Sequence, residues 1–63
     1  MKNFLESIGV KIPEGAVSYN TEGSNKIIFL IGQTGKFVES NLTQDQANEM
    51  KKGGCFGSFG WEI

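Results

Sequence analysis

Five consecutive apolar residues, Ile27 to Ile31, are the feature that most restricts how this chain folds. A run of this length is typical of a β-strand and falls far short of the roughly 20 residues that cross a membrane. Because no polar residue interrupts the run, we expect this strand to be buried on both faces. The fold is therefore expected to be a sheet in which this strand holds a central position.

Other segments of the chain also have periodic patterns. Val17, Tyr19 and Thr21 alternate with smaller residues, which is typical of a strand, and a turn signal separates this strand from the apolar run. The predicted strands are 16–21, 26–31, 36–40 and 55–63, and the predicted helices are 2–8 and 42–54. The pattern predicts a single α+β domain over residues 1–63, in the order α-β-β-β-α-β. Its sheet is expected to be mostly antiparallel, with three or four strands and the helices mainly on one face.

The second predicted helix has the clearest end signals. Thr43 followed by Gln46 is a capping box, in which each residue satisfies a backbone N–H at the start of the helix. Lysines 51 and 52 suit the negative end of the helix, and Gly53 is expected to stop it. Gly9 is expected to stop the first helix in the same way.

A chain of 63 residues has little core with which to stabilise itself. Cys55 is the only cysteine and there is no histidine, so neither an internal disulfide nor a structural zinc site is expected. Self-association is the remaining support, and we expect a homo-oligomer. Cys55 itself is expected to be a small buried hydrophobe, with an intermolecular disulfide as the alternative. The single cysteine and the lack of a secretion signal favour the cytoplasm.

The charged residues point away from catalysis. Six lysines, with no arginine, face seven acidic residues, a balance that disfavours general nucleic-acid binding. The carboxylates are scattered, and none stands in a motif with general acid/base or metal-ligand spacing. We therefore expect no catalytic, cofactor-binding or metal-binding residues, no enzyme activity and no membrane partner.

Three aromatic residues near the C-terminus, Phe56, Phe59 and Trp61, are the candidate partner-binding residues. Phe59 and Trp61 share one face of the predicted last strand, where the first expectation is that they anchor the core. Phe56 lies on the opposite face and is expected to be the best single contact, since exposed aromatics dominate protein interfaces. An open sheet edge, either 16–21 or the tail, would complete the surface. The leading function is a small protein-binding module of the adaptor or inhibitor type.

Two other functions remain open. Residues 42–54 resemble the double-glycine leaders of peptide precursors, which implies cleavage after Gly54 and release of residues 55–63. The same aromatics, Phe56, Phe59 and Trp61, with the nearby Lys51 and Lys52, are also compatible with stacking on single-stranded nucleic acid.

Overall fold

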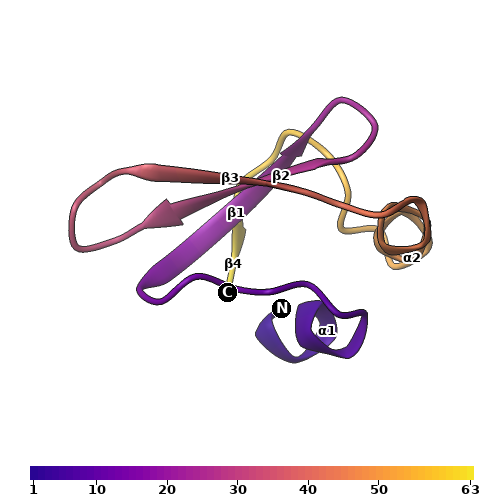
Figure 1. Ribbon diagram of the computed structural model, residues 1–63, viewed down its shortest axis with the longest axis horizontal. Coiled ribbons are helices and arrows are strands. Elements are labelled where there is room, and N and C mark those ends of the chain that lie inside the picture. Colours follow the sequence, from indigo (N-terminus) through magenta and orange to yellow (C-terminus); the bar gives the residue numbers. More distant parts are fainter.

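A computed structural model describes all 63 residues and contains one antiparallel sheet. The strands lie in the spatial order β3-β2-β1-β4 (Figure 1). This arrangement confirms the predicted α+β fold and element order, and it sets the number of strands at four. The elements are α1 (Lys2–Ser7), β1 (Ala16–Glu22), β2 (Lys26–Ile31), β3 (Phe37–Asn41), α2 (Gln44–Lys52) and β4 (Trp61–Glu62).

The strand β2 lies between β1 and β3, so its predicted central position is confirmed. Ile27 and Phe29 are completely buried, whereas Ile28 and Leu30, which point to the other face, are only half-buried. The expectation of burial on both faces is therefore wrong. The reason is that both helices cover the same face of the sheet, as Figure 1 shows, and leave the other face open.

The core between the sheet and the helices is small. Leu5 from α1 and Met50 from α2 belong to one buried cluster with Ile27 and Phe29 of β2 and Tyr19 of β1. Pairing in the sheet places Tyr19 opposite Phe29, so the side chains of both strands enter the core from the same face. Neither helix is long and apolar enough to span a membrane.

The helix ends follow local signals. The hydroxyl of Thr43 accepts a hydrogen bond from the Gln46 N–H at 3.1 Å, and the Gln46 side-chain oxygen accepts one from the Thr43 N–H at 2.9 Å. This confirms the capping box. At the other end of α2 the left-handed residue is Gly54, with φ of 73°, and Gly53 still has helical geometry with φ of −78°. The predicted stop at Gly53 is thus one residue early, whereas Gly9, with φ of 85°, follows α1 as expected.

Of the two segments expected as an open sheet edge, residues 16–21 and the tail, only the tail forms one. Strand β1 is not an edge, because β4 pairs with it through Ser18–Glu62 and Tyr19–Trp61. The tail is also not a continuous strand over residues 55–63, because only β4 is extended and residues 55–60 form an irregular loop. Hydrogen bonds from the side chains of Tyr19 and Thr21 and from the Thr21 N–H hold this loop to β1 in place of a strand ladder. The edges of the sheet are therefore β3 and the very short β4.

Candidate functional site

The C-terminal loop is held firmly against β1. Thr21, only 2% exposed, donates its hydroxyl to the Gly57 carbonyl at 2.9 Å and accepts from the Gly57 N–H at 2.6 Å. Its backbone N–H also donates to the Gly57 carbonyl, at 2.8 Å. Two residues before Gly57, the Cys55 carbonyl accepts a hydrogen bond from the Tyr19 hydroxyl at 3.1 Å. These hydrogen bonds fix the position of the loop, so the residues after Gly57 have a defined place on the surface.

Tyr19 is the base on which the tail aromatics rest. The Trp61 ring stacks on the Tyr19 ring, with 5.5 Å between centroids and 22° between planes. Burial raises the pKa of Tyr19 above its ordinary value, and the adjacent Cys55 raises it further. The phenol therefore stays neutral to higher pH than an exposed tyrosine and keeps its proton in the hydrogen bond to the Cys55 carbonyl.

Phe59 projects from this base into solvent. It meets Trp61 edge to face, with 6.2 Å between centroids and 83° between planes, yet 77% of it is exposed. Trp61 is half-buried and packs against the core cluster. The expectation that both residues are core anchors thus holds in part for Trp61 and is wrong for Phe59. We call Phe59 and Trp61 the tail aromatic pair.

Phe56 lies apart from this pair. It is half-buried, packs against the core cluster, and has the Lys51 ammonium 4.8 Å from its ring centroid. The expectation that Phe56 would be the exposed contact is therefore corrected. The regular strand on which it relied is absent, so alternation does not decide which aromatic faces water, and Phe59 takes that place.

This geometry gives little support to the two alternative functions, stacking on single-stranded nucleic acid and release of a peptide. Rings that are perpendicular, as in the tail aromatic pair, do not form a flat platform for successive bases. Lys51 is engaged over Phe56, which leaves less free positive charge beside the pair. Cleavage after Gly54 would release a segment whose first residue, Cys55, is buried and whose backbone is bonded to Tyr19 and Thr21.

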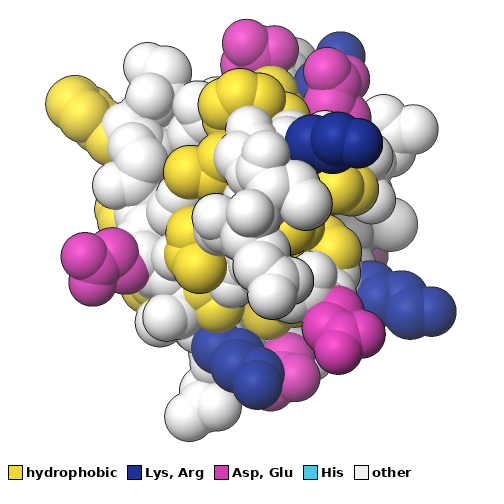
Figure 2. Space-filling model, turned by 90° about the vertical axis from the view of Figure 1, so that its left-hand side faces the viewer, with side chains coloured by type: hydrophobic (Ala, Val, Ile, Leu, Met, Phe, Trp, Pro, Cys, Tyr) yellow, Lys and Arg dark blue, Asp and Glu magenta, His cyan; other side chains and the backbone are white.

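A second exposed apolar region lies at the opposite edge of the sheet, and the sequence reasoning did not identify it. Every residue of β3 is exposed, including Phe37 (69%) and Val38 (39%). Phe37 pairs with Leu30 on the open face, where Ile28 is also half-buried and Val17 is exposed. Figure 2 views the end of the molecule where the β2–β3 hairpin turns, and hydrophobic side chains there lie among uncharged polar ones, with charges around them. One sequence signal could have identified β3 as an edge strand: only two of its residues are apolar, which is typical of an edge.

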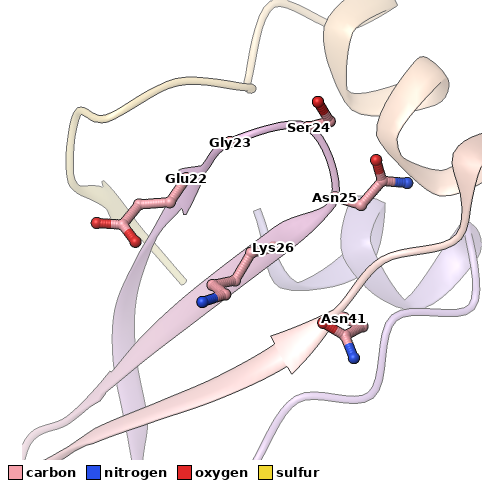
Figure 3. A pocket seen from close by; sticks show the side chains of 6 residues that line it. All are labelled: Glu22, Gly23, Ser24, Asn25, Lys26 and Asn41. Atoms are coloured by element: carbon pink, nitrogen blue, oxygen red, sulfur yellow. The ribbon is translucent and has the colours of Figure 1, made fainter.

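The polar hollow at the β1–β2 turn does not resemble a catalytic site. Its lining consists of Glu22, Gly23, Ser24, Asn25, Lys26 and Asn41. In Figure 3 the polar ends of these side chains point in different directions and share no focus. Two of them have structural partners: Asn25 donates to the Leu42 carbonyl at 3.2 Å, and Lys26 pairs with Glu39 at 3.1 Å. No group of three or more potential metal ligands (His, Cys, Asp or Glu) lies together anywhere in the chain.

The chain matches no protein-family model, and neither the curated proteins nor the solved structures with which it was compared are detectably similar to it. The candidate site therefore rests on geometry alone.

Proposed function

We propose that this protein is a non-catalytic protein-binding module, of the adaptor or inhibitor type, whose main contact is Phe59 supported by Trp61. The observation that carries the proposal is that Phe59 is the most exposed large hydrophobic side chain in the protein, at 77%. Its neighbour Trp61 is anchored on the buried Tyr19, so the ring projects from a firm base.

Such an arrangement has an energetic advantage in binding. Association costs roughly 0.5–1.5 kcal/mol for each flexible side chain that becomes immobilised. A phenyl ring has only two side-chain torsions, and the edge contact with Trp61 already restricts them. The fitting partner is a protein surface with an apolar pocket that accepts the Phe59 ring, rimmed by groups that contact the Trp61 edge.

The polar groups support a non-catalytic role. Nucleophilic and acid/base catalysis need side chains within hydrogen-bond reach that converge on a reacting atom. The side chains of the polar hollow diverge (Figure 3), and Cys55, the only thiol, is buried with its Sγ 3.4 Å from the Met50 carbonyl.

The test is a selection of binding fragments from a displayed genomic library of the source organism, with the wild-type protein as bait. Each selected fragment is made as a monovalent protein, and its affinity is read from the emission of Trp61, the only tryptophan. Phe59→Ala is expected to weaken binding by at least about 10-fold, because truncating a central aromatic contact typically costs about 2 kcal/mol or more.

The matched control is Phe37→Ala, which removes the second most exposed large hydrophobic side chain, at 69%, from the opposite edge of the sheet. It should leave the affinity for a monovalent fragment unchanged. The proposal is overturned if no fragment binds, or if those that bind lose as much affinity with Phe37→Ala as with Phe59→Ala.

A further inference from the structure

The outer edge of β3 carries unpaired backbone groups. Hydrogen bonds from the Ile31 N–H to the Lys36 carbonyl (2.8 Å) and from the Leu42 N–H to the Asn25 carbonyl (2.6 Å) bracket the β2–β3 ladder. Antiparallel pairs alternate between bonded and non-bonded, so Val38 and Ser40 direct their N–H and C=O groups toward β2. Phe37, Glu39 and Asn41 consequently direct theirs away from the sheet.

The strand β3 has few of the features that keep an edge from pairing with another strand. Edges are commonly blocked by shortness, a bulge, a proline or a charged side chain, most often lysine. The strand β4 is only two residues long, and the irregularity of the sheet lies in β1, between Ala16 and Ser18. By contrast, β3 has five residues in unbroken register and contains neither proline nor lysine. Its one charged side chain, Glu39, is paired with Lys26 at 3.1 Å. Its edge is therefore a template for strand addition.

We infer that the strand added there is β3 of a second copy of this chain, in antiparallel orientation and centred on Val38. In this register Phe37 and the partner's Glu39 form a hydrogen-bonded pair, joined by two backbone bonds. The two-fold axis generates a second such pair, between Glu39 and the partner's Phe37. The two Val38 side chains then lie opposite each other on the helix-bearing face, about 5 Å apart at Cβ. The result is one continuous eight-stranded sheet.

Charge and turn geometry select this register over its neighbours. A register centred on Glu39 would place two carboxylates directly opposite each other, which is destabilising. A register centred on Phe37 would require Gly35 to pair as a strand residue, but Gly35 belongs to the turn and has φ of 69°. Centring on Val38 avoids both problems and leaves each Glu39 with its own Lys26, 3.1 Å away.

Two properties of the chain favour a second copy as the occupant. Only 10 of the 63 residues are buried, so the core is small. The one cysteine is free and buried, so no disulfide stabilises the fold. Chains of this size usually need a disulfide, a metal or a partner in addition to the core. In addition, a hollow lies beside β3 on the helix-bearing face, lined by Ile12, Pro13, Phe29 and Val38 together with the polar residues Lys11, Glu14 and Ser40. The two-fold axis would bring this hollow next to its own copy and cover the exposed part of both Val38 side chains.

The dimer would also set the positions of the two proposed binding sites relative to each other, and this point rests on the proposed function. Since β3 and β4 are opposite edges of the sheet, the dimer leaves both tail aromatic pairs free. Seven strand spacings separate the two β4 strands, or roughly 33 Å. The dimer would thus be a bivalent binder.

The test is sedimentation equilibrium of the wild type and two edge variants. Val38→Lys places two ammonium groups opposite each other, and Glu39→Pro removes an outward N–H that the β2–β3 ladder does not use. Each variant is expected to weaken dimerisation by at least about 10-fold. Ser24→Lys adds the same charge as Val38→Lys at an exposed turn and should remain dimeric. Unchanged Trp61 emission verifies that each variant is folded.

Amide hydrogen exchange on the wild type gives a second readout that needs no variant. The dimer predicts that the Phe37 and Glu39 amides become protected as protein concentration rises, while the Val38 amide is protected throughout. The inference is overturned if the wild type stays monomeric, if both edge variants dimerise like the wild type, or if the Phe37 and Glu39 amides exchange rapidly in the dimer. Loss of fragment binding by Phe59→Ala with the dimer intact would separate the two proposals.

Discussion

At the scale of single residues, Tyr19 connects the core to the candidate binding surface. Its ring contacts Phe29 inside the core, at 6.4 Å between centroids, and supports Trp61 on the outside. Its hydroxyl holds the Cys55 carbonyl. One side chain therefore positions both the tail loop and the tail aromatic pair, and its protonation state affects both.

The raised pKa of Tyr19 predicts a loss of stability at high pH. In the unfolded chain the phenol ionises near its ordinary pKa of about 10, whereas the folded protein keeps it neutral to higher pH. The unfolded state thus binds fewer protons above pH 10, so stability is fully present below that pH and falls as pH rises toward the folded pKa. Urea unfolding at several pH values measures this loss.

Tyr19→Phe is the control for this prediction, because it removes the only tyrosine. The variant should be less stable than the wild type at neutral pH, since the Cys55 carbonyl loses its donor, and should show a smaller loss above pH 10. A tyrosinate absorbance that appears at pH 10 while the protein remains folded would contradict the prediction.

At the scale of elements, the tail loop depends on β1 more than on its own strand. The strand β4 has two residues, whereas Thr21 alone makes three hydrogen bonds to Gly57 through its hydroxyl and its N–H. Thr21 is also buried, at 2% exposure. It acts as a clamp that replaces the missing ladder.

Thr21→Val tests this clamp, because it keeps the shape of the side chain and removes both hydroxyl bonds. The Gly57 N–H would then lose its partner in a part-buried place, so we expect about 1–3 kcal/mol less stability in urea unfolding. Trp61 emission should shift to longer wavelength as the loop loosens. Thr34→Val, at an exposed turn, should change stability by less than about 0.5 kcal/mol. Equal effects of the two substitutions would exclude the clamp.

At the scale of the whole molecule, the sheet has helices on one face only and two unlike edges. The edge at β4 is short and carries the tail aromatic pair, and the edge at β3 is long and unprotected. In the two proposals the edges have separate tasks, since a dimer formed at β3 would not compete with a partner bound at the tail aromatic pair.

Self-association through β3 predicts that stability depends on protein concentration. When a dimer dissociates on unfolding, mass action raises the unfolding midpoint as the concentration rises. The urea midpoint of the wild type should therefore increase over a wide concentration range, and that of Val38→Lys should stay constant. A constant midpoint for the wild type would show that the folded unit is the monomer.

The limits of sequence reasoning follow from the same residues. Phe56 and Phe59 are three positions apart, and the sequence assigned them to faces by alternation in a strand. In the structure this segment is a loop bonded to Thr21, 36 positions before Gly57, and Phe59 is its exposed ring. No local pattern contains this information.

The sequence by itself determined the elements, their order and most of their ends, because these depend on neighbours a few positions apart. The capping box of Thr43 and Gln46, the apolar run of β2 and the stop at Gly9 are all of this kind. Tertiary structure decided which strands are edges, which face of β2 is open and which aromatic reaches solvent. These depend on where β4 and the helices pack, and the packing is chosen by contacts between residues distant in the chain.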